Sequence, residues 1–317
     1  MKFFLTGGAG FIGFHVAKLL LERGDEVVCV DNFNDYYDVQ IKEDRTKILS
    51  EFPGFKLYRE DIRDYDAMKK IFEENEIDKV CHLAARAGVR YAILHPLLYE
   101  EVNIKGTTIL LDLAKDFKVK NFVFASSSSV YGGNTKVPFA EDDPVDRPIS
   151  PYAATKKACE LMAYSYHHLH DLKVSGLRFF TVYGPWGRPD MALFKFTKAI
   201  VEGGTIDVYN YGKMKRDFTY IDDIAQGVLG ALDNINDYEI FNLGNSNTVE
   251  LEYFIELVEK ELGSKAKRND MPLQPGDVPM TYADISKAQK MIGFNPQVNI
   301  EDGIRNFVIW YKDYYNV

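Results

Sequence analysis

Cysteine is scarce in this chain, and long apolar runs and an excess of basic residues are absent. Cys29, Cys81 and Cys159 form no Cys-x-x-Cys pair and lie in strand or helix patterns, so we expect buried free thiols and a cytoplasmic protein. No apolar segment approaches the ~20 residues of a membrane-spanning helix. The first residues read as a strand that leads straight into glycines, so we expect neither a signal peptide nor a membrane anchor.

The charge balance also excludes one class of partner. With 38 basic and 47 acidic residues, the net charge of −9 argues against a general nucleic-acid-binding surface, while it is compatible with a local basic pocket. His167, His168 and His170 stand close together in the sequence, but no acid or cysteine supports them at metal-ligand spacing. We interpret them as one solvated helix face and expect no metal site.

A glycine-rich turn is the strongest local signal. Residues 6–13, Thr-Gly-Gly-Ala-Gly-Phe-Ile-Gly, lie between an apolar run and a helical pattern, and Gly7, Gly10 and Gly13 are spaced by three. Such a turn lets backbone N–H groups approach a pyrophosphate. A second apolar run ends on Asp31, near the ~20-residue distance of a carboxylate that accepts ribose hydroxyls. This carboxylate would repel a 2′-phosphate, so we predict NAD rather than NADP. The alternative is a structural turn with Asp31 merely starting a loop.

The fold class follows from the order of the patterns. Strand candidates recur at 2–6, 27–31, 55–59, 79–84, 121–126 and 174–180. Helical patterns at 13–23, 64–75, 104–117 and 152–171 separate most of them. The alternation predicts an α/β protein with a Rossmann-type doubly wound parallel sheet over 1–180. Prolines and glycines then interrupt the pattern, which predicts a smaller α/β C-terminal substrate lobe over 181–317. Its helices are expected near 191–202, 221–233, 250–262, 284–291 and 301–313. The loops after the strands should converge on one cleft.

The candidate catalytic residues lie at the end of the fifth predicted strand and in the helix after it. Tyr152 and Lys156 share one helix face, and a cation beside a phenol favours the ionised form that a general base needs. The same spacing recurs at three other tyrosines, but only Tyr152 opens the helix after that strand. The strand itself ends in four serines, 126–129, whose hydroxyls can hydrogen-bond a sugar hydroxyl. A polar loop or helix cap is the alternative for the serines.

Six motifs occur in one order along the chain: TGGAGFIG, Asp31, HLAA (82–85), SSSSVYG (126–132), YAATK (152–156) and RFFTVYGP (178–185). Because of these ordered motifs, which extend along essentially the whole chain, the protein resembles the extended short-chain dehydrogenase/reductase family that acts on nucleotide sugars. The resemblance implies that Tyr152 is the base that oxidises a sugar C4 hydroxyl with bound NAD, that Ser127 supplies the partner hydroxyl, and that Lys156 promotes ionisation of the tyrosine and holds the nicotinamide ribose. It places these residues at the cofactor: Gly7, Gly10, Phe11, Ile12, Gly13, Asp31, Asn32, Asp61, Ile62, Leu83, Ala84, Ala85, Asn103, Tyr152, Lys156 and Phe179.

Within this family, the sequence of residues 178–192, together with residues 87–91 and 274–278, is similar to that of the UDP-glucuronate 4-epimerases. The resemblance implies that Arg188, with Thr181, recognises a C6 carboxylate and that Arg216 binds the pyrophosphate of a UDP-sugar. Its expected substrate contacts are Ser127, Ser128, Ser129, Thr181, Arg188, Val208, Tyr209, Arg216, Gln274 and Asp277. A solvated loop arginine is the alternative for Arg188. Arg86 stands where these epimerases commonly have glutamine, which leaves fine specificity open.

The expected reaction is interconversion of UDP-glucuronate and UDP-galacturonate through a 4-keto intermediate. Family resemblance argues against a 4,6-dehydratase, which follows the catalytic hydroxyl with Asp-Glu where Ser128 and Ser129 stand here. It also argues against a decarboxylase, which carries glutamate at position 129. The alternatives are a UDP-glucose/UDP-galactose 4-epimerase, a dehydrogenase with net NADH output, and a non-catalytic NAD-binding scaffold. Helices 104–117 and 152–171 carry apolar residues beyond one face. Members of the family that the chain resembles commonly pair these helices into the four-helix bundle of a dimer, so the resemblance implies a homodimer; internal burial of these side chains is the alternative.

Overall fold

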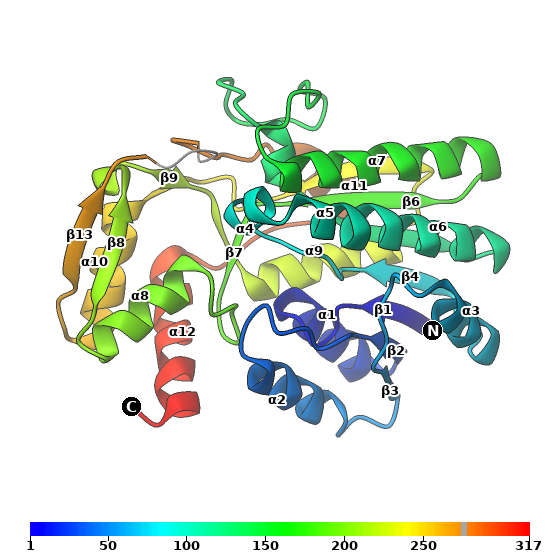
Figure 1. Ribbon diagram of the computed structural model, residues 1–317, viewed down its shortest axis with the longest axis horizontal. Coiled ribbons are helices and arrows are strands. Elements are labelled where there is room, and N and C mark those ends of the chain that lie inside the picture. Colours follow the sequence, from blue (N-terminus) through cyan, green and yellow to red (C-terminus); the bar gives the residue numbers. More distant parts are fainter. Residues whose placement is uncertain (274–277) are drawn as a thin grey trace.

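The computed structural model describes residues 1–273 and 278–317, and a parallel sheet of seven strands lies at its centre (Figure 1). The strand order is β11-β6-β5-β4-β1-β2-β3. Their bounds are β1 (Lys2–Thr6), β2 (Glu26–Val30), β3 (Phe55–Tyr58), β4 (Lys79–His82), β5 (Asn121–Ser127), β6 (Val174–Phe179) and β11 (Tyr238–Leu243). The order reverses between β1 and β4, as in a doubly wound Rossmann sheet, which confirms the predicted fold class.

Helices cover both faces of the sheet, so its central strands are buried on both sides and read as continuous apolar runs. One face packs against α3 (Tyr65–Glu74), α6 (Gly106–Asp116) and α7 (Pro151–His170). The other packs against α1 (Phe11–Glu22), α2 (Val39–Leu49), α9 (Ile221–Asp233) and α11 (Ser286–Ile292). Short segments precede α6: α4 (Val89–Leu94), α5 (Pro96–Tyr99) and the π-helix η1 (Glu100–Lys105).

The start of α7 follows from its sequence. The hydroxyl of Ser150 accepts a hydrogen bond from the backbone N–H of Ala153, and Pro151 occupies the first helical position. These two residues fix where the helix begins. Tyr152 therefore lies in the first turn of α7, beside the carboxyl end of β5, and the expected helix over 152–171 is confirmed.

The chain after residue 180 contributes to two regions. β11 pairs with β6 in the main sheet, α9 packs on α1, and α11 packs on α9 and β11. The rest forms a separate group beside the sheet (Figure 1). This group comprises α8 (Ala192–Val201), α10 (Leu251–Leu262), α12 (Ile300–Tyr315), the pair β8 (Thr205–Tyr209) and β13 (Lys267–Met271), and the short pairs β7 (Thr181–Tyr183) with β10 (Phe218–Tyr220) and β9 (Lys215–Arg216) with β12 (Val249–Glu250).

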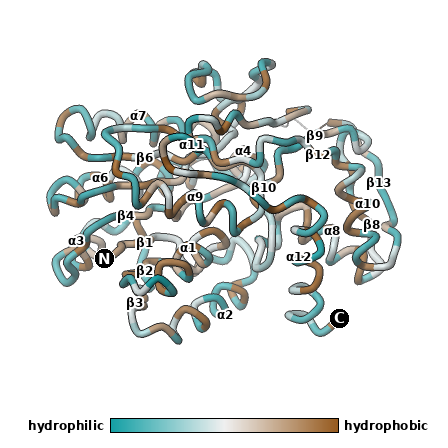
Figure 2. Tube along the Cα trace, turned by 180° about the vertical axis from the view of Figure 1, so that it is seen from behind, coloured by the Kyte–Doolittle hydropathy of each residue, from teal (hydrophilic) through white to brown (hydrophobic). Residues whose placement is uncertain are grey.

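The five helices expected in this second half are all present, each within a few residues of its predicted bounds. Hydrophobic and hydrophilic segments alternate along α10 and α12 in Figure 2, as expected of helices with one buried and one exposed face. The described residues also include two 3-10 turns, η2 (Ser128–Tyr131) and η3 (Asn210–Gly212). Across the two described ranges, every helix is too short or too polar to span a lipid bilayer.

Candidate active site

A cleft of about 960 Å³ opens at the carboxyl ends of the sheet strands. Its walls come from the turn after β1, the end of β2, the loops after β3, β4, β5 and β6, the start of α7, and the segment from β7 to β9. This is where an open parallel sheet binds its ligands. The cleft brings together these predicted residues: Gly7, Gly10, Phe11, Ile12, Gly13, Asp31, Asn32, Asp61, Ile62, Leu83, Ala84, Ala85, Ser127, Ser128, Ser129, Tyr152, Lys156, Phe179, Thr181, Arg188, Tyr209 and Arg216.

Two predicted residues within the described ranges, Asn103 and Val208, do not line the cleft. Asn103 is buried behind the cleft, where its side-chain amide donates to Arg86 O at 3.0 Å and Thr155 Oγ1 at 3.0 Å. Its carbonyl oxygen accepts from Arg86 N, so Asn103 holds the loop after β4 in place. Val208 points into the core. Gln274 and Asp277 fall outside the described residues.

The glycine turn forms a cradle that a side chain would fill. Gly7 has φ +75°, and a Cβ at Gly13 would lie 2.1 Å from the Gly7 carbonyl oxygen. α1 begins at Phe11, and its N-cap Gly10 offers no side-chain acceptor to the first helical N–H groups. Those donors remain available to an anion at the helix N-terminus. The turn therefore fits the pyrophosphate of a dinucleotide.

Asp31 lies at the next strand end and is held by backbone donors. Its carboxylate accepts from Ala9 N at 3.1 Å and Phe33 N at 2.9 Å. Burial raises the pKa of Asp31, and the Phe33 N–H and the Lys42 ammonium oppose that rise. Lys42 of α2 also lines the cleft and donates to Asn34 O at 2.6 Å. Burial lowers the pKa of Lys42 to about 8. Lys42 could not be predicted from the sequence, because the pattern of α2 does not read as a helix with a buried face.

Asp61, expected near the adenine, is engaged in an ion pair. Arg63 donates from Nε to one Asp61 oxygen at 2.9 Å, and Asn32 Nδ2 donates to the other at 2.9 Å. The Arg63 hydrogen bonds lower the pKa of Asp61 to about 2. The carboxylate is therefore ionised and fixed at the edge of the cleft.

The three predicted catalytic side chains line the same cleft. Lys156 is buried, with Nζ donating to Ala125 O at 2.7 Å, so the ammonium joins α7 to the end of β5. Ser127 Oγ accepts from Ser129 N at 3.2 Å and lies 3.2 Å from Ser129 Oγ. The Tyr152 ring packs edge-on against Tyr99, with ring centroids 6.1 Å apart. A phenol, an ammonium and a hydroxyl thus border one cavity, the set needed to move a proton on a sugar hydroxyl.

A buried ion pair lies directly beneath these groups. Glu160, one turn after Lys156, accepts from Ser126 Oγ at 2.7 Å and from Arg178 Nε at 2.9 Å. Arg178 also donates to the Tyr131 hydroxyl at 3.0 Å. Burial raises the pKa of Glu160, but its bonds with Arg178 and Ser126 outweigh this and hold that pKa below its ordinary value. The network joins α7, β5 and β6, and sequence reasoning did not single out Glu160.

Arg188, in the loop after β7, also lines the cleft. Its Nε donates to Asp190 Oδ1 at 2.9 Å, and Nη2 donates to the second Asp190 oxygen. Burial lowers the pKa of Arg188, but Asp190 together with Tyr36 and Tyr37 outweighs this and raises that pKa above its ordinary value, so the guanidinium is charged. The Tyr36 ring lies against this guanidinium, 5.7 Å from centroid to Cζ, and Arg86 lies at the same distance from the same ring. Tyr36 and Asp190 are further cleft residues that the sequence analysis missed.

The substrate-side groups farther along the cleft also make contacts. Arg216 on β9 donates from Nη1 to Lys215 O at 3.0 Å and to Pro279 O at 3.2 Å. The guanidinium of Arg90 lies over the Tyr209 ring, 4.5 Å from its centroid. Both arginines line the cleft, and together they make this end of it strongly basic.

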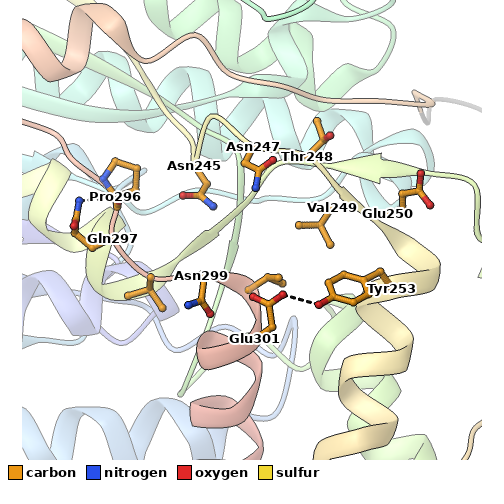
Figure 3. A pocket seen from close by; sticks show the side chains of 12 residues that line it. Asn245, Asn247, Thr248, Val249, Glu250, Tyr253, Pro296, Gln297, Asn299 and Glu301 are labelled. Carbon is orange, nitrogen blue, oxygen red and sulfur yellow. Dashed lines mark hydrogen bonds between the residues drawn. The ribbon is translucent and has the colours of Figure 1, made fainter.

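A second hollow of about 630 Å³ lies between the segments 245–253 and 296–301 (Figure 3). Amide side chains border it, and the Tyr253 hydroxyl donates to Glu301 at 2.6 Å. None of the predicted site residues within the described ranges lines it. Those ranges also contain no group of three or more histidine, cysteine, aspartate or glutamate side chains placed to hold a metal ion.

A parallel sheet of this order, with a glycine cradle, an acid at the next strand end, and Tyr and Lys one turn apart on a helix, defines an extended short-chain dehydrogenase/reductase. The family model described as GDP-mannose 4,6 dehydratase matches residues 4–307. The chain belongs to this family.

Individual relatives and solved structures show which members of the family this chain is similar to. A UDP-glucuronate 4-epimerase of Thermodesulfobacterium geofontis is 49% identical over 312 residues, covering 98% of this chain and 96% of the relative. The crystal structure of a UDP-glucuronic acid 4-epimerase from Bacillus cereus, in complex with UDP-glucuronic acid and NAD, matches with TM-score 0.93 and 35% identity over 99% of this chain and 100% of that one. A UDP-glucose 4-epimerase from Thermotoga maritima, with UDP-glucose, matches with TM-score 0.90 and 30% identity over 99% and 100%.

Proposed function

We propose that this protein is an NAD-dependent UDP-glucuronate 4-epimerase that interconverts UDP-glucuronate and UDP-galacturonate. The observation that carries the proposal is that Arg188 lines the same cleft as Tyr152, Lys156 and Ser127. A guanidinium binds a carboxylate through two charge-assisted hydrogen bonds, which distinguishes a uronate from a neutral hexose. The likeness to the Thermodesulfobacterium and Bacillus cereus epimerases supports the same substrate.

The cofactor is NAD, held at the glycine cradle and Asp31. The free N–H groups of α1 bind its pyrophosphate, and the Asp31 carboxylate accepts the adenosine ribose hydroxyls. When bound, NAD supplies hydride chemistry: it takes a hydride from C4 of the sugar and returns it. Asp31 also disfavours a 2′-phosphate, although Lys42 beside it reduces that repulsion.

The residues of the chain move the proton. Tyr152 takes the proton of the C4 hydroxyl as a phenolate, and the Ser127 hydroxyl hydrogen-bonds the same oxygen. Lys156, anchored on Ala125 O, holds positive charge beside the phenolate and binds the nicotinamide ribose. The 4-keto sugar then turns its other face toward the cofactor. Tyr152 returns the proton, so the configuration at C4 inverts.

The carboxylate of the substrate needs its own control, because a 4-keto uronate is a β-keto acid that loses CO2 readily. Arg188, with Thr181 and the serines after β5, keeps the carboxylate charged and away from the orientation that cleavage needs. Arg216 binds the pyrophosphate of UDP, and Tyr209 borders the uracil end. Val208 is buried in the core, so we do not propose it as a contact of the uracil. Dehydration is not proposed, because Ser128 and Ser129 follow Ser127 where a dehydratase needs acids.

A UDP-glucose/UDP-galactose 4-epimerase is the second candidate. The structural likeness to the Thermotoga maritima enzyme favours it, and so does the fact that Asp190 already engages Arg188. Purified protein incubated with UDP-glucuronate, UDP-glucose and UDP-xylose, followed by separation of the products, distinguishes the two. We expect UDP-galacturonate from UDP-glucuronate, without CO2 release and without a net rise in absorbance at 340 nm. Turnover of UDP-glucose alone would establish the second candidate.

We further propose that the protein works in the cytoplasm as a homodimer. Its three cysteines are buried free thiols. Leu161, Tyr164 and Leu169 of α7 are 58%, 52% and 70% exposed, and α7 lies beside α6 (Figure 1). Leu110, Leu111 and Leu113 of α6 are instead buried within the chain. Pairing α6 and α7 with the same helices of a second copy would cover the exposed side chains in a four-helix bundle.

We also assign residues 1–180 to an NAD-binding Rossmann domain and 181–317 to a nucleotide-sugar-binding lobe. Two elements of the second segment, α9 and β11, pack with the first. This exchange ties the two parts together around the cleft.

A further inference from the structure

Arg188 and Asp190 form a close pair in the loop between β7 and α8. Their side chains are 20% and 25% exposed, and both line the cleft. The pairing is bidentate, with Arg188 Nε and Nη2 each donating to one oxygen of the carboxylate. Such a fork fixes the plane of the guanidinium as well as its position. The Tyr36 ring restrains the same group from one side.

The pair uses two of the five N–H donors of the guanidinium, which leaves three for another partner. An arginine has five N–H donors, and Asp190 occupies the edge formed by Nε and Nη2. The edge formed by Nη1 and Nη2 keeps its own pair of donors. A guanidinium can therefore bind two carboxylates at once, one on each edge.

The charges around Tyr36 also leave room for a second anion. Arg86 and Arg188 both lie 5.7 Å from the Tyr36 centroid, and Asp190 neutralises one of them. One positive charge remains in this part of the cleft. A uronate carboxylate would neutralise it, whereas a neutral hexose would leave it unpaired.

We propose that Asp190 is a positioning residue for uronate recognition: it holds Arg188 by one edge so that the other edge binds the substrate carboxylate. The inference rests on the proposed function and deepens it. Without Asp190 the long arginine side chain would keep its charge but lose its fixed orientation. The substrate would then have to order the guanidinium when it binds, which weakens binding.

The test is the Asp190→Asn variant, loaded with NAD, with dissociation constants for UDP-glucuronate and UDP-glucose measured by calorimetry. Losing the anionic partner of Arg188 should weaken UDP-glucuronate binding on the order of 10-fold. UDP-glucose binding should change less than about 2-fold, because its C6 hydroxyl needs no charged partner. Asp190→Glu, which keeps the carboxylate, should recover part of the loss.

Two controls separate positioning from other roles. Adding Asp190→Asn to Arg188→Ala should weaken UDP-glucuronate binding no further, because Asp190 acts through Arg188. Asp233→Asn removes a surface carboxylate paired with Arg23, away from the cleft, and should leave both constants unchanged. Carrying every variant in a Tyr152→Phe background removes the proposed base and so prevents turnover during the titrations. An absence of epimerisation in the unmodified protein would then overturn the proposed function and not this inference. Tighter UDP-glucuronate binding by Asp190→Asn, equal losses for both ligands, or no change would each overturn the inference.

Discussion

At the scale of single residues, the cleft depends on charged side chains that are buried together with their partners. Glu160 and Arg178 are 1% and 2% exposed in their side chains and form a bidentate pair, and Lys156 is anchored on a carbonyl. A buried charge is costly unless hydrogen bonds and an opposite charge compensate it. Glu160 and Arg178 meet that condition through each other, and Lys156 has a backbone carbonyl acceptor, so the proton-moving side chains lie on a rigid support.

Arg188→Ala should remove most of the selectivity for uronates. Losing a charge-assisted contact of about 1.5–3 kcal/mol corresponds to roughly 10- to 150-fold weaker binding of UDP-glucuronate. UDP-glucose binding should be little affected, since it carries no carboxylate. Calorimetric titration of both ligands into NAD-loaded protein measures this difference, and unchanged UDP-glucuronate affinity would refute the carboxylate role of Arg188.

His82 makes the fold sensitive to acid. It is buried between Thr6 Oγ1 at 2.7 Å and Thr107 Oγ1 at 2.9 Å, and burial lowers its pKa from 6.5 to about 3. Below pH 6.5 the His82 imidazole binds a proton in the unfolded chain but stays neutral in the folded protein. Stability that is fully present above pH 6.5 is therefore lost as the pH falls toward 3, by up to ~1.4 kcal/mol per pH unit.

The His82→Gln variant tests this acid sensitivity. Urea unfolding at pH 6.5, 5.5 and 4.5 should show a shallower decline in the variant than in the unmodified protein. Part of the decline should persist, because burial also lowers the pKa of His15 to about 3. Parallel slopes in the two proteins would show that His82 does not contribute.

At the scale of elements, the sequence predicts those helices and strands whose position is set by a local residue pattern. The strands β1 to β6 and the long helices follow from apolar periodicity, and the start of α7 follows from Ser150 and Pro151. α2 escaped prediction because its inward face mixes apolar residues with Lys42 and Arg45, which reads as an exposed surface. β11 escaped because its partner β6 is distant in the sequence, so only the folded sheet identifies it.

The cap of α7 gives a test at this scale. Ser150→Ala removes the acceptor of the Ala153 N–H and should cost about 0.5–2 kcal/mol of stability. The first turn of α7 carries Tyr152, so kcat should fall more than KM rises. Urea unfolding and steady-state kinetics measure both effects, and Ser165→Ala, on an exposed turn of the same helix, is the matched control. An unfolding free energy equal to that of the control would contradict the capping role.

At the scale of the whole molecule, long-range contacts assemble the cleft. Arg45 of α2 donates from Nη1 to Ala9 O in the glycine turn at 2.8 Å and from Nη2 to Trp186 O, two residues before Arg188. The buried Arg45 side chain thus joins the glycine turn to the loop that carries Arg188. Most of the residues that the motifs predicted line the cleft, because each motif is local. The motifs could not predict Tyr36, Lys42 or Asp190, which enter the cleft only through the tertiary fold.

The dimer is testable at the same scale. Leu161→Glu places a charge on the exposed face of α7, where a four-helix bundle would have to bury it. We expect the unmodified protein to have the mass of a dimer in light scattering and the variant to have that of a monomer. Ile235→Glu, a similarly exposed apolar residue after α9, should leave the mass unchanged. A monomeric unmodified protein would refute the proposed bundle.

Retention of the C4 hydrogen tests the proposed chemistry most directly. UDP-glucuronate carrying deuterium at C4 is turned over in ordinary water, and the product is examined by NMR. If Tyr152 moves only the hydroxyl proton while bound NAD takes and returns the hydride, UDP-galacturonate keeps its deuterium at C4. Replacement of that deuterium by hydrogen from the solvent would contradict the mechanism.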